Sequence, residues 1–167
     1  LSTHSTSAER NFATEFSWTN SGCGTDGIVV DRGSNETLNH SGQSMVAWNW
    51  KANGSGVSNT DGSITSTVSA NTDAGFSIVS WTGNGIAGAS VGHGLDSAPE
   101  MIITKDRDAT KNWVVYNKEI GATNVLLLNS TAASGSNNAY NDTDPTATVF
   151  ECDAGNPSYG TEININN

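Results

Sequence analysis

The sequence predicts an all-β protein made of short antiparallel strands, and three observations support this fold class. Runs rich in aromatic and β-branched residues recur along the chain, and Phe76–Trp81 is the clearest of them. The breaks between runs are turns, such as Gly83-Asn84-Gly85, whose glycines tolerate positive φ. Ser, Thr, Asn and Gly fill the connections, and no segment requires a helix.

The first third of the chain holds three expected strands. Glu15–Trp18 alternates polar and apolar residues, and Ile28–Val30 is a short apolar run. Gln43–Trp50 is the strongest of the three, because Val46, Trp48 and Trp50 share one face of a strand. A tryptophan inside a strand is usually at a core or half-core position, so we expect Trp48 and Trp50 to be buried.

A polar stretch then separates two parts of the chain. Asn53–Gly62 is the best linker candidate, and a boundary between two pieces of a repeat would lie near residues 53–62. We favour a single module over residues 1–167, in which the first fifty residues complete the later sheets. Neither part alone has enough strands. Ile64–Val68 follows as an expected edge strand.

The second half continues with apolar runs between polar turns. The expected strands are Ala87–Val91, Met101–Thr104, Trp113–Tyr116, Val125–Leu128 and Thr146–Cys152. Ala132–Pro145 is expected to be a long polar loop, and Glu162–Asn166 a second edge strand. The expected core includes Phe76, Ile78, Ile102, Val115 and Leu127.

Charge and composition restrict the partners. A net charge of −10 with only seven basic residues disfavours nucleic acid and anionic membranes as partners. It favours solubility, cation binding, or contact with a neutral or basic surface. No apolar run approaches the ~20 residues that span a bilayer. The chain starts at Leu1 without a signal pattern, so we expect an excerpt of a longer repeat protein. Cys23 and Cys152 are interpreted as free buried thiols rather than a disulfide.

Two strings that look catalytic lack the context their chemistry needs. Gly88–Gly92 fits the G-x-S-x-G nucleophile elbow, which places a serine at a strand–turn–helix junction. Here Ser90 is followed by a glycine- and proline-containing loop that ends at Pro99. Residues 83–88 spell G-x-G-x-x-G, again without a following helix to receive a pyrophosphate. We therefore predict no catalytic residues and no enzyme.

The candidate binding residues lie in the expected loops. Tyr140 is the apolar anchor of the Ala132–Pro145 loop, where a ring could contact a sugar. His93 lies between two glycines, so its ring could be exposed and bind a ligand. The alternative is a structural histidine that packs in the loop and hydrogen-bonds a backbone carbonyl. Calcium takes oxygen ligands from acidic loops, so Asp142, Asp144 and Asp153 are the candidate Ca²⁺ ligands.

Several segments carry a resemblance to a known repeat. GFSIVSWTGNG, VGHGL, APEMIITKDRD, NWVVY and LLLN occur in order between Gly75 and Asn129, and Gly33–Gly54 is similar to the end of a preceding copy. Together they resemble a repeat domain in predicted virion proteins of marine bacteriophages. The resemblance implies a β-sandwich of the jelly-roll or concanavalin/laminin-G kind and a virion role. The family repeat closes with something like VAWNW, whereas this chain ends in YGTEININ, so the pairing of residues 153–167 stays open.

The function hypothesis follows from this resemblance. It implies an extracellular virion structural protein, in a tail fibre, tail spike or capsid decoration, that works by display, assembly and receptor contact. Its partners would be other copies of itself, other virion proteins and a cell-surface glycan. A carbohydrate-binding module of a secreted bacterial protein is the alternative. A depolymerase is disfavoured because no catalytic constellation is visible in the sequence.

Overall fold

The structure is a computed structural model that describes residues 42, 44, 46, 48–153 and 161–164. The chain divides into two compact units, Arg10–Asn49 and Leu1–Glu9 with Trp50–Asn167. All strands of the described residues lie in the second unit, and no helix occurs among them. The all-β prediction is therefore confirmed. The division falls shortly before residues 53–62, and the single-module prediction stays a prediction.

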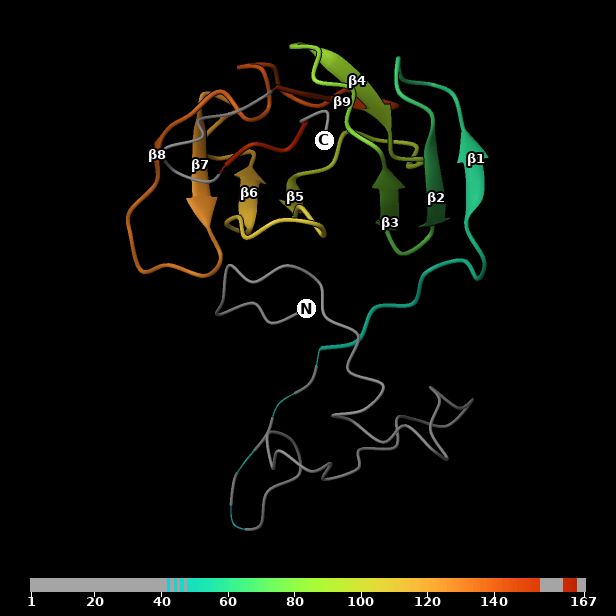
Figure 1. Ribbon diagram of the computed structural model, residues 1–167. Helices are drawn as coiled ribbons and strands as arrows, with labels where there is room; N and C mark the ends of the chain where they lie inside the picture. The colour runs from blue at the N-terminus through green and yellow to red at the C-terminus, as the bar shows by residue number, and fades with distance from the viewer. Residues whose placement is uncertain (1–41, 43, 45, 47, 154–160, 165–167) are drawn as a thin grey trace. The chain divides into compact units, whose positions relative to one another are not determined.

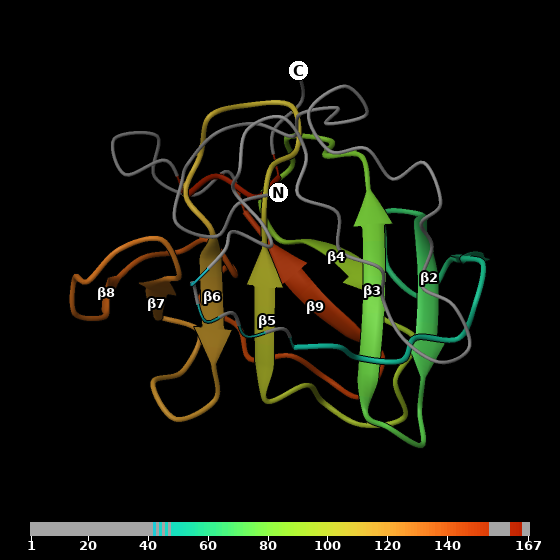
Figure 2. The ribbon, with the colours of Figure 1, turned by 90° about the horizontal axis from the view of Figure 1, so that it is seen from below.

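Three antiparallel sheets make up the described part of this unit (Figure 1). The first joins β1 (Val57–Asn59), β2 (Ser66–Asn71) and β3 (Phe76–Trp81). The second pairs β4 (Ala89–Gly92) with β9 (Val149–Cys152). The third joins β5 (Met101–Thr104), β6 (Val114–Asn117), β7 (Asn124–Leu127) and β8 (Gly135–Ser136). Figure 2 shows β3 beside β5, with the β4–β9 pair behind them.

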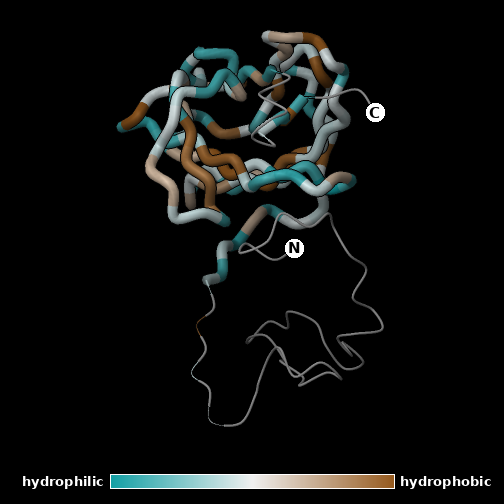
Figure 3. The backbone as a smooth tube through the Cα atoms, turned by 60° about the vertical axis from the view of Figure 1, so that its left-hand side comes forward, coloured by the Kyte–Doolittle hydropathy of each residue, from teal (hydrophilic) through white to brown (hydrophobic). Residues whose placement is uncertain are grey.

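The core lies between the β4–β9 pair and the inner faces of the other sheets. Val91 of β4 and Phe150 of β9 belong to one buried cluster with alternate residues of the facing strands, such as Val114 and Tyr116 of β6. The ring of Phe150 packs edge to face with the rings of Trp81 and Tyr140, at centroid distances of 5.5 and 6.4 Å. In Figure 3 hydrophobic stretches run through the middle of the unit, and hydrophilic stretches lie mainly in the connections.

The β1–β2 connection lies directly against β4. Ile64 N donates to Ser90 O (2.9 Å), and Ile64 and Val91 form a parallel bridge. A Cβ at Gly62 would lie 2.4 Å from Ser90 O, so this close approach of two backbones requires glycine. The contact joins the first sheet to the β4–β9 pair.

The strand predictions of the second half agree with the structure within a few residues. β3 and β5 have the expected bounds, and β4, β6, β7 and β9 overlap the expected runs. Two predictions are wrong. The expected linker Asn53–Gly62 contains β1. The expected edge strand Ile64–Val68 overlaps β2 only from Ser66 on, and β2 pairs on both sides. The pairing of β1 is hard to predict because the strand is short, and because Val57 and Ser58, on its two opposite faces, are both exposed to solvent.

Other corrections concern burial. Trp48 and Trp50, expected in a core strand, are in no strand and are 76% and 63% exposed. Ile78, expected in the core, is 56% exposed, because it lies on the face of β3 opposite Val79. Residues 162–164, expected in an edge strand, are buried and in no strand. The predicted strands Glu15–Trp18 and Ile28–Val30, together with Cys23, lie outside the described residues.

Candidate functional site

A polar cavity of about 370 Å³ opens between the end of β3 and the β5–β6 connection. Its walls are residues 79–83 on one side and residues 104–108 on the other, and Glu162 and Ile163 complete it. This volume lies in the range of small-molecule sites, which begins at about 300 Å³. The cavity is therefore the candidate functional site.

The side chains of the β5–β6 connection fix its backbone. Asp106 Oδ1 accepts hydrogen bonds from the amides of Asp108 (2.9 Å) and Ala109 (3.1 Å), as in an Asx-turn. Lys105 Nζ donates to the carbonyl oxygens of Asp106 (2.5 Å) and Ala109 (3.0 Å). Burial lowers the pKa of Lys105, and the Asp106 carboxylate opposes this shift. This wall is held in place by its own polar groups.

Glu162 contributes a buried carboxylate to the cavity. Its side chain is 7% exposed, and Oε1 accepts a 2.6 Å hydrogen bond from Lys111 Nζ. Among the described residues, Glu162 Oε2 and Asp106 Oδ2 are buried and have no hydrogen-bond partner. A buried carboxylate oxygen without a partner is costly, so both oxygens favour a hydrogen-bond donor or a cation beside them. Both residues line the same cavity.

The segment that carries Glu162 is held by the buried side chain of Asn164. Asn164 Oδ1 accepts from Asn84 N (2.8 Å), and Asn164 Nδ2 donates to Ile86 O (2.7 Å) and Asn84 Oδ1 (3.1 Å). At the other end of the segment, Thr161 Oγ1 accepts from Asn137 Nδ2 (2.9 Å). These bonds explain why residues 161–164 are buried without pairing as a strand. We call the Asn84–Asn164 contact the asparagine clasp.

His93 is a buried histidine that hydrogen-bonds backbone groups. Its Nε2 lies 3.2 Å from Thr146 O, and its Nδ1 accepts from Leu95 N (3.1 Å). Only a neutral ring with its proton on Nε2 satisfies both partners. Burial lowers the pKa of His93, and the bond to Thr146 O and the charge of Asp61 oppose this shift. The sequence left two interpretations of His93, a ligand-binding residue and a histidine that hydrogen-bonds a backbone carbonyl. The geometry agrees with the second.

Tyr140 is a core residue, so the prediction that its ring is offered to a sugar is wrong. The side chain is fully buried, and its hydroxyl lies 2.9 Å from Thr104 Oγ1 and 3.3 Å from Val114 O. Its ring meets Tyr116 edge to face at 5.7 Å. Although the surrounding loop is polar, the hydrogen-bond partners of the Tyr140 hydroxyl are the buried Thr104 and backbone carbonyls of the sheet. Burial accordingly raises the pKa of Tyr140.

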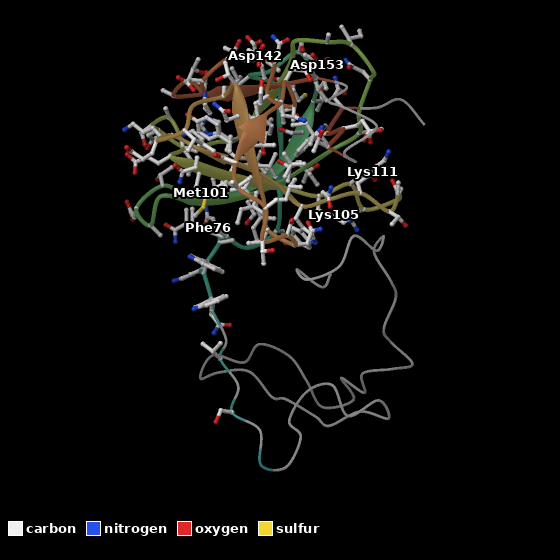
Figure 4. The ribbon with its side chains drawn as sticks, turned by 90° about the vertical axis from the view of Figure 1, so that its left-hand side faces the viewer. Phe76, Met101, Lys105, Lys111, Asp142 and Asp153 are labelled. Carbon is white, nitrogen blue, oxygen red and sulfur yellow. The ribbon has the colours of Figure 1, made fainter. Side chains whose placement is uncertain are left out.

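Two of the three candidate Ca²⁺ ligands, Asp144 and Asp153, bind different partners. Asp144 Oδ1 accepts from the Tyr116 hydroxyl (3.2 Å) and from Ala122 N (3.1 Å), while Asp153 Oδ2 accepts from Asn138 Nδ2 (2.8 Å). Burial, aided by the Asp144 charge, raises the pKa of Tyr116 to about 12. Figure 4 shows Asp142 and Asp153 on the side of the unit away from Lys105 and Lys111.

No group of three His, Cys, Asp or Glu side chains within residues 48–153 and 161–164 could hold a metal ion. The calcium prediction stays a prediction. Ser90 lies within β4 opposite Glu151, and its Oγ accepts from Ser63 N (3.0 Å). The one sequence signal at Asp106 is the D-x-D string Asp106-Arg107-Asp108, which is common in polar loops. No sequence signal marks Glu162, whose position depends on a tertiary contact 51 residues away.

A comparison with protein families gives one match. Residues 1–165 match the family described as Domain of unknown function (DUF7483). The chain belongs to this family. No curated protein and no solved structure matches it. In the part of the chain that the structure describes, no helix has the length and hydropathy to cross a membrane.

Proposed function

We propose that this chain is a non-catalytic structural module of a bacteriophage virion, in a tail fibre, tail spike or capsid decoration. It works by display and assembly, with contact to a receptor on the host surface. The phage assignment is supported by the resemblance of the segments between Gly75 and Asn129 to virion repeat domains. We also propose that its sheets form a β-sandwich of the jelly-roll kind, since the β4–β9 pair covers the core on one side.

The observation that carries the assembly role is the amount of apolar side chain left exposed. Trp50, Ile78 and Met101 are each more than half exposed. Soluble proteins that act alone rarely expose large contiguous apolar patches, which instead mark contacts with other proteins. A module that works inside a larger particle would bury this surface there.

Mass spectrometry of purified phage particles from the source of the gene tests this proposal. We expect peptides of the chain in the particle fraction, at a copy number that matches a repeated component. Antibodies against the chain should also decorate the particles in electron micrographs. Finding the chain only among secreted bacterial proteins would contradict the proposal.

The cavity favours a second candidate function, which is recognition of a glycan. Asp106 and Glu162 each bring a carboxylate oxygen without a partner, and Trp81 lies in the same wall. Sugar hydroxyls donate hydrogen bonds to carboxylates, and sugar rings contact aromatic faces. This module would then be a carbohydrate-binding domain, either on the virion or on a secreted protein.

A glycan array, followed by calorimetry on the best sugar, tests this second function. Glu162→Gln should weaken sugar binding about tenfold or more, because a charged acceptor contributes about 1.5–3 kcal/mol to a hydrogen bond. The matched control is Glu100→Gln, an exposed glutamate paired with Lys118 outside the cavity. Equal binding by both variants would exclude the cavity as the sugar site.

A further inference from the structure

The dipeptide Asn-Gly occurs twice in the chain, at Asn53-Gly54 and at Asn84-Gly85. In this dipeptide the glycine has no side chain that would hinder attack of its backbone nitrogen on the asparagine side chain. That attack closes a succinimide ring, and hydrolysis of the ring replaces the asparagine by aspartate or isoaspartate. The structure gives the two copies opposite surroundings, so that one serves as a reference for the other.

Asn53-Gly54 lies in an open part of the chain just before β1. Both residues are exposed, and a Cβ at Gly54 would contact no atom within 4 Å. Asn53 donates its backbone amide to Ser69 Oγ (3.1 Å), but its side-chain amide makes no hydrogen bond to the part of the chain that the structure describes. Neither packing nor hydrogen bonding therefore keeps this side chain from approaching Gly54 N.

Asn84-Gly85, by contrast, is held by the asparagine clasp. Asn84 Oδ1 accepts hydrogen bonds from Ile86 N (3.0 Å) and Asn164 Nδ2 (3.1 Å), and Asn84 N donates to Asn164 Oδ1 (2.8 Å). Asn164 itself is fully buried. These bonds restrain both the side chain and the backbone of Asn84, so attack by Gly85 N requires a local opening of the clasp.

We propose that Asn53 is a site of spontaneous deamidation, and that the asparagine clasp protects Asn84 from the same reaction. Gly54 N attacks Asn53 Cγ and forms a new C–N bond. The bond between Cγ and Nδ2 breaks, and the proton lost by Gly54 N ends on the leaving nitrogen, which departs as ammonia. Water then adds to one of the two ring carbonyls, and the ring opens to aspartate or to isoaspartate. Water is the one co-reactant, and no atom changes its oxidation state.

The isoaspartate product would loosen the attachment of this segment to β2. Ser69 Oγ bridges the two residues, because it accepts from Asn53 N (3.1 Å) and donates to Gly54 O (2.8 Å). The main chain of an isoaspartate runs through its side-chain carbon and is longer by one atom, so a single hydroxyl no longer spans both groups. Each event also adds a negative charge to a chain whose net charge is −10. The segment before β1 would thus carry a mark of the age of the molecule.

Peptide mapping by mass spectrometry tests this proposal, after incubation of the full chain at mildly alkaline pH in water enriched in heavy oxygen. The heavy oxygen enters the modified residue, and an isoaspartate-specific methyltransferase with a labelled methyl donor detects the isoaspartate. Asn53→Gln is the blocked variant, because its longer side chain would have to close a larger ring. Asn164→Ala removes the clasp, and the wild type in concentrated urea is the reference without structure. Circular dichroism verifies that each variant is folded.

In the folded wild type we expect Asn53 to react about tenfold or more faster than Asn84, because Asn84 reacts only from a locally open state. In urea the two rates should become similar, since a glycine follows both asparagines. Asn164→Ala should speed the reaction at Asn84 and leave Asn53 unchanged, and Asn53→Gln should abolish the label at residue 53.

Two results would overturn the proposal. The first is a folded wild type in which Asn53 reacts no faster than Asn84, and the second is a difference between the sites that persists in urea. An unchanged rate at Asn84 in folded Asn164→Ala would refute protection by the clasp. If that variant does not fold, the rates of Asn84 in the folded and the urea-unfolded wild type decide the same point, because equal rates mean no protection.

Discussion

Removing the hydroxyl of Tyr140 should destabilise the fold measurably. In the structure this buried group bonds Thr104 Oγ1 at 2.9 Å and lies 3.3 Å from Val114 O. Tyr140→Phe leaves the threonine hydroxyl buried with one partner fewer, which costs about 1–3 kcal/mol. Tyr140→Ala would also leave a cavity where the ring meets Tyr116 and Phe150, and we expect a loss of about 3–5 kcal/mol.

Urea denaturation followed by tryptophan fluorescence measures both losses. The midpoint should fall while the slope of the unfolding free energy stays constant, since the native surface hardly changes. The pairing itself is tested by a double-mutant cycle with Thr104→Val. The double variant should be less destabilised than the sum of the two single changes, by about 0.5–3 kcal/mol. Additive effects, or a loss below about half a kilocalorie for Tyr140→Phe, would refute a hydroxyl pair in the core.

Other expected outcomes concern a histidine, an asparagine and a cysteine. Burial lowers the pKa of His93 from its ordinary 6.5, so the unfolded chain binds that proton more readily. The contribution of this group to stability should be intact above pH 6.5 and fall as the pH drops toward the lowered folded pKa; urea titrations of His93→Gln should lack that loss. Asn164→Ala should cost about 1–3 kcal/mol and speed hydrogen exchange at the Asn84 amide, and unchanged exchange would exclude the clasp. Cys152 is fully buried with a thiol pKa raised to about 12, so maleimide should label it, as mapped by mass spectrometry, only after denaturation.

The strands with strong local signals could be predicted from the sequence. β3 and β5 combine β-branched and aromatic residues with clear turns at both ends, and their bounds agree with the structure. β1 could not be found, because Val57-Ser58-Asn59 is short and polar and forms a strand only through its register with β2. The local composition of residues 57–59 carries no information about the pairing with β2.

Burial was harder to predict than strand position. Phe76–Trp81 is apolar at alternate positions on both faces, so periodicity alone did not reveal that Ile78 faces away from the core. Tyr140 shows the opposite error, since a polar loop composition concealed an aromatic ring in the centre of the unit. The cavity depended on Glu162 and Asp106, which are 56 positions apart and meet only through tertiary structure. Such sites leave no spacing pattern to find.

The asparagine clasp imposes an order of events on biosynthesis. It joins residues that are 80 positions apart, and the clasped segment also supplies Ile163 to the core. Ribosomes add about 5–20 residues per second, so roughly 4–16 s pass between the synthesis of Asn84 and that of its partner. During that interval the β3–β4 turn has no clasp and the nascent unit exposes apolar side chains. A host cell that produces this protein quickly would need chaperones to keep the unfinished chains from aggregating.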